Sequence, residues 1–275
     1  MAEREPHILI SNDDGIHSLG LAALAAAMAD IGRVTIVAPE RERSAVGRGI
    51  TLHKPLRAEP VEMELSSDSV RAYVSNGTPS DCVVLGCLDL IGRAPDLVVG
   101  GINRGGNFGE DVLYSGTVSV AMEGAIMGLP AFAISVAPVH LGEALPGELD
   151  YAVAARFAGA LAERILAHAL PPDSFLNVNV PALPPDRIAG VAVTRFGRMR
   201  YRERLDKRHD PRGTVYYWLA GEPQLDGAPE GTDIRAVVDG KISVTHADMN
   251  LTSPVSAAHL AAVVPDESAY RASAD

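Results

Sequence analysis

The stretch that decides the fold is His7-Ile8-Leu9-Ile10-Ser11-Asn12-Asp13-Asp14-Gly15. Its apolar first part predicts a short buried strand, and Asn-Asp-Asp-Gly predicts the turn that leaves it. A helical pattern follows from about Gly20 to Ile31. Asp13 and Asp14 therefore stand just past a strand end, where open α/β sheets bind their ligands. Two neighbouring carboxylates are costly to hold together without a cation, so this turn is the first candidate for a metal site.

The same strand-then-helix pattern recurs along the chain and predicts one α/β domain, residues 1–275, with a parallel sheet and right-handed crossovers. Residues of about 50 to 75 alternate in short runs and predict a small antiparallel patch or hairpin. The further expected strands are 33–38, 96–101, 130–136, 175–180 and 242–245. The further expected helices are 78–91, with Thr78 as N-cap and Pro79 as its first residue, and about 115–129, 149–168 and 254–264.

Composition narrows the class of protein. The chain has 275 residues, of which 47% are hydrophobic, enough for a sizeable core. Its net charge of -11 argues against a general nucleic-acid-binding surface. Cys82 and Cys87 match no zinc spacing and are expected to be core thiols. The first six residues lack a signal-peptide apolar stretch and no run reaches membrane-spanning length, so a cytoplasmic protein without membrane contact is expected.

Three polar loops follow predicted strands and are expected along one edge of the sheet. The first carries Asp13 and Asp14, the second carries Ser44, and the third runs from Asn103 past Asn107. Their carboxylate, hydroxyl and amide oxygens suit Mg²⁺, Mn²⁺ or Ca²⁺ better than zinc. Each loop also has a plain interpretation, as a turn, a flexible loop or a helix cap. The shared edge is what favours a functional site.

Ser115-Gly116-Thr117 opens the helix that follows the third loop. The N-terminus of a helix offers free N–H groups and a positive dipole end, so these residues form a candidate phosphate site. For an isolated serine, a simple N-cap is the better interpretation. A hard cation beside a phosphate site is suited to hydrolysing a phosphate monoester. The cation polarises a phosphoryl oxygen and lowers the pKa of bound water.

The motifs resemble the survival protein SurE family along nearly the whole chain. The resemblance rests on 8–16, Arg43-Ser44, Gly77-Thr78-Pro79-Ser80-Asp81-Cys82-Val83, 100–107, Tyr114-Ser115-Gly116-Thr117-Val118, Leu176-Asn177-Val178-Asn179-Val180-Pro181 and Gly231-Thr232-Asp233. It implies a Rossmann-like three-layer core with a β-hairpin extension and a C-terminal arm. The region of about 195–245 would form the extended hairpin, and the extensions would be exchanged between subunits of a homodimer or homotetramer.

The resemblance also implies an activity: a phosphatase acting on nucleoside 5′- or 3′-monophosphates, and in some members on short polyphosphate. It implies one divalent cation per subunit, Mg²⁺ or Mn²⁺. Carried over position by position, the metal ligands are Asp13, Asp14, Ser44 and Asn103, and the catalytic residues are Asp13 and Asp14. The phosphate contacts are Asn107 and Ser115, with Gly116 and Thr117 shaping the helix start.

Several alternatives stay open. A phosphatase with an aspartyl nucleophile is disfavoured because Asp13 and Asp14 are adjacent rather than spaced Asp-x-Asp. A non-catalytic nucleotide- or metal-binding regulatory protein is the second rival. His17 and Asp248 are candidates for an assisting role, although relatives differ from this chain around Asp248. The basic run 195–213 is expected to be a solvated or subunit-crossing hairpin rather than a polyanion site.

Overall fold

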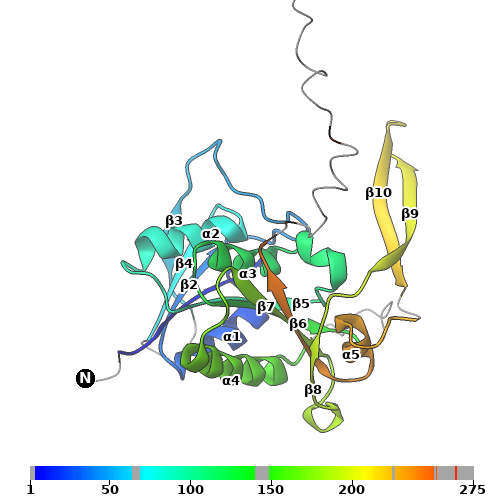
Figure 1. Ribbon diagram of the computed structural model, residues 1–275. Coiled ribbons are helices and arrows are strands. Elements are labelled where there is room, and N and C mark those ends of the chain that lie inside the picture. Colours follow the sequence, from blue (N-terminus) through cyan, green and yellow to red (C-terminus); the bar gives the residue numbers. More distant parts are fainter. Residues whose placement is uncertain are drawn as a thin grey trace, which may run out of the picture.

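Strand β1 (His7–Ser11) lies inside a nine-stranded sheet with the order β3-β4-β2-β1-β5-β6-β7-β11-β8 (Figure 1). The computed structural model describes residues 4–63, 69–139, 149–224, 227–250, 252 and 264. The other strands of the sheet are β2 (Arg33–Pro39), β3 (Ala58–Val61), β4 (Val70–Ser75), β5 (Leu97–Arg104), β6 (Ala131–Ala137), β7 (Ser174–Pro181), β8 (Val191–Thr194) and β11 (Ile242–Asp248).

The strands from β4 to β7 are mutually parallel, in the spatial order β4-β2-β1-β5-β6-β7. This is the doubly wound order, in which the chain first builds outward from β1 on one side and then crosses to β5 on the other. The carboxyl ends of β1 and β5 therefore flank the switch point at which such sheets bind ligands. The α/β Rossmann-like fold expected from the sequence is confirmed.

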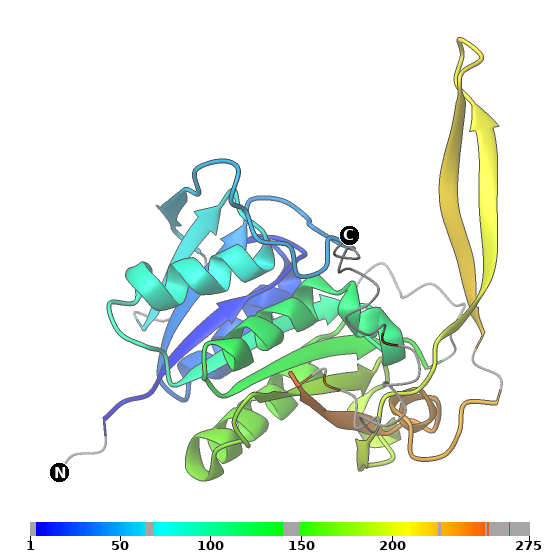
Figure 2. The same cartoon turned by 45° about the horizontal axis from the view of Figure 1, so that its top comes forward.

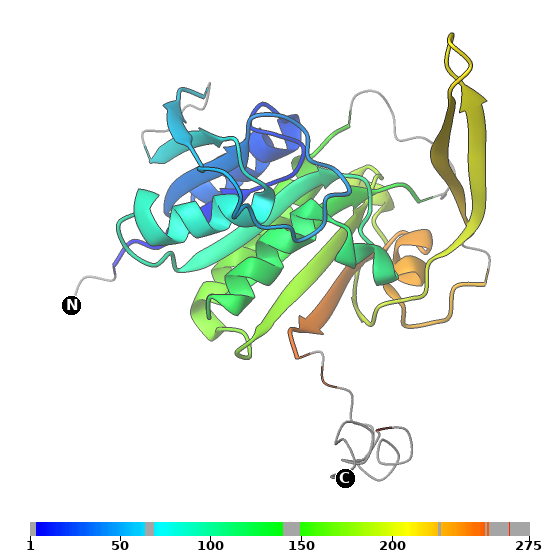
Figure 3. The same cartoon turned by 90° about the horizontal axis from the view of Figure 1, so that it is seen from above.

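Helices cover both faces of the sheet and make a three-layer structure (Figures 1 and 3). Helices α1 (Leu19–Ala29) and α4 (Ala152–His168) pack on one face around Ile8 and Ile10. Helices α2 (Pro79–Leu85) and α3 (Gly116–Ile126) pack on the other face around Leu9. Because successive residues of β1 point to opposite faces and both faces are covered, its run is apolar throughout rather than alternating.

The expected helix starts are confirmed by their caps. Thr78 and Asp81 form a reciprocal capping box at α2, with Pro79 as the first helical residue. Ser115 caps α3 by accepting a hydrogen bond from the N–H of Val118 at 3.1 Å. Cys82 is buried, Cys87 is half-buried, and both are free thiols, as the sequence predicts.

Other elements differ from the sequence-based expectation. The patch expected at 50–75 is an antiparallel β3–β4 pair, but β4 also joins the main sheet parallel to β2. Helix α2 continues as a π-helix, η1 (Gly86–Leu90), and short 3-10 segments η2 (Gly109–Leu113) and η3 (Pro185–Arg187) occur in loops. Helix α5 (Asp233–Val238) was not expected, because a six-residue helix carries too little periodicity to stand out from a loop. The helix expected at 254–264 falls outside the described residues, apart from its last position, Val264.

Strands β9 (Arg200–His209) and β10 (Val215–Gln224) form a separate antiparallel hairpin that projects from the body of the protein (Figure 2). This hairpin contains most of the basic run predicted at 195–213. In the part of the chain that the structure describes, every helix is too short or too polar to cross a membrane.

Candidate active site

The turn after β1 is built by Asn12. Its side-chain Oδ1 accepts a hydrogen bond from the N–H of Gly15 at 3.2 Å, and its Nδ2 donates to the carbonyl of Gly15 at 3.1 Å and to the Ser18 hydroxyl at 2.7 Å. Gly15 has φ +95°, a conformation that side chains rarely adopt. The amide of Asn12 thus closes the turn from inside and fixes the direction in which Asp13 and Asp14 leave the strand.

Asp13 is held by the start of helix α3. One carboxylate oxygen accepts the N–H of Gly116 at 3.2 Å, and the other accepts the hydroxyl of Thr117. A Cβ at Gly116 would lie 2.5 Å from the Cβ of Asp13, so glycine is the residue that lets the helix approach this closely. The helix N-terminus expected to bind phosphate therefore first stabilises a protein carboxylate, as its dipole favours.

The second and third loops also reach this turn. The N–H of Arg43 donates to the carbonyl of Asp13 at 2.7 Å, which places Ser44 beside the first loop. The N–H of Arg104 donates to Oδ2 of Asp14 at 3.4 Å, which places the end of β5 and its Asn103 beside the same carboxylate. The structure thus brings together the loops after β1, β2 and β5 and the start of α3, as the winding of the sheet predicts.

The ionised forms of Asp13 and Asp14 are both disfavoured by their surroundings. Burial raises the pKa of Asp13, against the hydrogen bonds from Thr117 and Gly116 that lower it. Burial, followed by the charge of Asp13, raises the pKa of Asp14 to about 6. Glu42, which the sequence interpretation did not single out, adds a third negative charge that also raises the pKa of Asp14. A cation held between these oxygens would offset the repulsion.

The remaining candidates lie at different depths. Ser44 is exposed, and its hydroxyl donates to Glu42 at 2.6 Å. Asn103 is half-buried, and its Nδ2 donates to the carbonyl of Gly105 at 2.8 Å, which leaves the amide oxygen as a possible ligand atom. Ser115 is nearly buried; its hydroxyl accepts the N–H of Val118 and keeps its own hydrogen for donation.

Asn107 is buried, and its side chain is turned into the protein. Its Nδ2 donates to the hydroxyl of Ser135 at 2.8 Å, and the residue is 8% exposed. His17 and Asp248, the two candidates for an assisting role, have no hydrogen bond to Asp13 or Asp14 among the contacts of the described residues, and both are exposed. The predicted site residues do not include Ser135, Asn177, Asn179 or Asp233. The first three carried a visible signal, because they are polar residues inside apolar strands.

The donor set fits a hard cation. The described residues contain no group of three His, Cys, Asp or Glu side chains that could hold a metal, so a zinc-type site is disfavoured among them. Two carboxylates with hydroxyl and amide oxygens nearby are instead the ligands of Mg²⁺ or Mn²⁺. Asp13 and Asp14 would hold such an ion, with Ser44 and Asn103 as the further donors.

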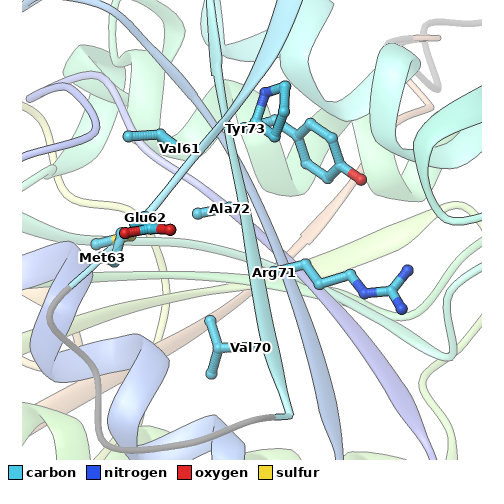
Figure 4. Close-up of a pocket in the computed structure, with 8 residues that line it drawn as sticks. Val61, Glu62, Met63, Val70, Arg71, Ala72 and Tyr73 are labelled. Atoms are coloured by element: carbon cyan, nitrogen blue, oxygen red, sulfur yellow. The ribbon is translucent and has the colours of Figure 1, made fainter.

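Two hollows lie outside this cluster. One is a shallow pocket of about 490 Å³ at the β3–β4 edge, where Arg71 and Tyr73 project from β4 on the side opposite to Val70 and Ala72 (Figure 4). The other, of about 760 Å³, is lined largely by apolar side chains such as Met122 and Phe175 and begins at η2. The second is lined by Asp248, a candidate for an assisting role, but neither is lined by a candidate metal or phosphate ligand, so the carboxylate pair defines the site.

A doubly wound sheet with paired carboxylates at its switch point, facing a helix N-terminus, defines a class of α/β proteins equipped to bind a cation and an anion together. The family model described as "Survival protein SurE" matches residues 8–203. The chain is 50% identical over 246 residues to the 5'-nucleotidase SurE of Heliobacterium modesticaldum, covering 90% of this chain and 87% of that one. It is 51% identical over 247 residues to the 5'-nucleotidase SurE of Moorella thermoacetica, covering 90% and 91%.

A solved structure agrees with these sequence matches. The crystal structure of the SurE protein from Aquifex aeolicus has a TM-score of 0.76 to this chain at 40% identity, covering 90% of this chain and 95% of that one. This protein therefore belongs to the SurE family, as its motifs indicate.

Proposed function

We propose that this protein is a divalent-cation-dependent phosphomonoesterase that hydrolyses nucleoside 5′-monophosphates to nucleoside and phosphate. The observation that carries the proposal is the pair Asp13–Asp14 at the switch point, directly against the N-terminus of α3. Its relatives named 5'-nucleotidase SurE support the substrate class. We extend the proposal to 3′-monophosphates and short polyphosphate, because a site built around phosphate oxygens constrains the rest of the substrate less.

Each residue has a distinct role in this proposal. A bound Mg²⁺ or Mn²⁺, one per subunit, would polarise a phosphoryl oxygen and lower the pKa of a water molecule. Asp13 and Asp14 hold the ion, and Asp13, fixed by Thr117 and Gly116, also orients the attacking water and accepts its proton. The Ser115 hydroxyl donates to a phosphate oxygen while it caps α3.

The rival route through an aspartyl-phosphate is less well supported. Both oxygens of Asp13 already accept hydrogen bonds from α3, and the residue is only 5% exposed. Phosphatases with an aspartyl nucleophile carry Asp-x-Asp, whereas Asp13 and Asp14 are adjacent, which also counts against this route. Trapping of a phosphorylated Asp13 or Asp14 after reaction with substrate would establish the rival route instead.

The test is phosphate release from AMP, 3′-AMP and p-nitrophenyl phosphate with Mn²⁺ or Mg²⁺, repeated with EDTA. We expect release that EDTA abolishes, and absence of any cation-dependent release would refute the proposal. Asp14→Asn should abolish release and weaken Mn²⁺ binding, measured by electron paramagnetic resonance. Asp30→Asn, at an exposed carboxylate at the end of α1, is the matched control and should change neither. A regulatory nucleotide-binding protein would bind AMP without releasing phosphate.

We further propose that the β9–β10 hairpin contacts a second copy of the chain in a homodimer or homotetramer. It projects from the body, and Trp218 and Leu219 expose 60% and 91% of their surfaces. Large exposed apolar side chains of this kind mark interaction surfaces. Sedimentation of wild type and Leu219→Asp checks this, and a wild-type monomer would refute it. The two free thiols fit a reducing compartment such as the cytoplasm, which fractionation would test.

A further inference from the structure

Strand β7 carries two asparagines where its neighbours are apolar. Asn177 and Asn179 are both completely buried, and they alternate with Val178 and Val180, which pack in the core beneath α1 and α4. On the adjacent strand β6, Ser135 pairs in register with Asn179 and is also completely buried. Burying an amide or a hydroxyl destabilises the fold unless the group is hydrogen-bonded. The hydrogen-bond partners of these side chains therefore indicate their role.

All three side chains bind one residue, Asn107. The Oδ1 of Asn179 accepts the main-chain N–H of Asn107 at 2.8 Å. The Nδ2 groups of Asn177 and Asn179 each donate to the main-chain carbonyl of Asn107 at 2.9 Å. The Ser135 hydroxyl accepts the side-chain Nδ2 of Asn107 at 2.8 Å. Side chains of β6 and β7 therefore bond both main-chain polar groups and the side-chain amide of Asn107.

One amide is kept at a cost to stability. The Oδ1 of Asn177 is buried and has no hydrogen-bond partner among the described residues. An unsatisfied buried acceptor lowers the stability of the fold, and an apolar side chain at this position would avoid that loss. What this position holds in return is the bond from the Asn177 Nδ2 group to the carbonyl of Asn107.

The far end of the same loop is held by a buried carboxylate. Asp233, completely buried at the start of α5, accepts the N–H of Gly109 at 2.9 Å through Oδ2 and the N–H of Gly197 at 2.7 Å through Oδ1. Gly109 has φ +49°, and a Cβ there would meet the carbonyl of Gly197 at 2.5 Å. The loop from Asn107 to Gly109 is thus fixed at both ends, directly before η2 leads to Ser115.

We propose that Ser135, Asn177 and Asn179 are positioning residues for the phosphatase reaction. They set the conformation of Asn107 and, through the chain, of Asn103 before it and Ser115 after it. Asp233 fixes the other end of the loop. This inference rests on the proposed function, since the loop is assigned to the metal and phosphate contacts.

A matched pair of serines tests the proposal. Ser135 and Ser243 pair with Asn179 from opposite sides, on β6 and β11, and both are completely buried. Ser135 contacts the loop, whereas Ser243 bonds only to Thr194 at 2.8 Å, among the contacts that the structure describes. Ser135→Ala and Ser243→Ala therefore remove the same hydroxyl from similar surroundings, and only Ser135→Ala touches the loop. Asn179→Ser is the second loop variant, which keeps a polar group too short to reach Asn107.

Each variant is measured for thermal unfolding, for kcat and KM with AMP and Mn²⁺, and for amide hydrogen exchange of residues 103–109. We expect Ser135→Ala and Asn179→Ser to lose kcat/KM roughly 10- to 100-fold, the scale of a small misplacement of site groups. Part of the loss should be in kcat, because saturating substrate does not restore a displaced group. Both variants should also lose exchange protection in the loop. Ser243→Ala should keep kcat/KM within about twofold of wild type and keep the protection, at a similar melting temperature.

Equal loss of activity in the two serine variants would overturn the proposal, since the effect would then be general destabilisation. Unchanged exchange protection in the loop variants would also overturn it. A wild-type protein without cation-dependent phosphate release would refute the proposed function instead. Hydrogen exchange alone would then decide whether these side chains hold the loop.

Discussion

Replacing Gly116 with alanine tests whether the approach of α3 to Asp13 sets the reactivity of the site. The new Cβ would lie 2.5 Å from the Cβ of Asp13 and 2.8 Å from its Oδ2. Non-bonded carbons rest at about 3.5–4.0 Å, so the carboxylate or the helix start must move by roughly 1 Å. Asp13 cannot swing away freely, because both of its oxygens are bonded to α3 and it is buried.

A displacement of about 1 Å in a site costs roughly 100-fold in rate, and overpacking costs about 1–3 kcal/mol of unfolding free energy. We therefore expect Gly116→Ala to lower kcat/KM for AMP about 100-fold, weaken Mn²⁺ binding and lower the urea midpoint. Gly159→Ala in α4 is the control, because its nearest foreign atom is 3.8 Å away. That variant should gain about 0.5–1 kcal/mol and keep its activity. Activity of Gly116→Ala within threefold of Gly159→Ala would refute the reasoning.

Three further predictions follow from single sites. Because the pKa of Asp14 is raised to about 6, the cation-free protein binds an extra proton on folding between the ordinary carboxyl value and about pH 6, so this group lowers stability as pH rises through that window. Asp14→Asn should therefore raise the melting temperature in EDTA at pH 8 and flatten its pH dependence; a lower melting temperature there would contradict this. Thr78→Ala removes the capping box of α2 and should cost about 1 kcal/mol in urea unfolding while kcat stays unchanged. Burial raises the pKa of the Cys82 and Cys87 thiols to about 12, so a thiol-specific disulfide reagent should label the native protein slowly at pH 8 and both thiols quickly in urea; fast native labelling would argue against this burial.

The sequence by itself determined the local features of this protein. Apolar runs of strand length, alternating with helical patterns, indicated the parallel α/β sheet, because each strand is buried on both faces. Thr78, Pro79 and Ser115 marked helix starts, because a cap bonds only to residues three or four positions away. Asp13 and Asp14 were also recognisable in the sequence, because they are adjacent charges just past a buried strand.

Only the tertiary structure decided which of these features meet. The strand order places β5 beside β1, and this alone brings Asn103 to the opening turn, about ninety residues away in the chain. The bonds from Gly116 and Thr117 show that the helix start proposed to bind phosphate also supports Asp13. Likewise, the asparagines of β7 are visible in the sequence as polar residues in an apolar strand, but their partner Asn107 is not. Hydrogen bonds between distant segments depend on packing, which local periodicity does not encode.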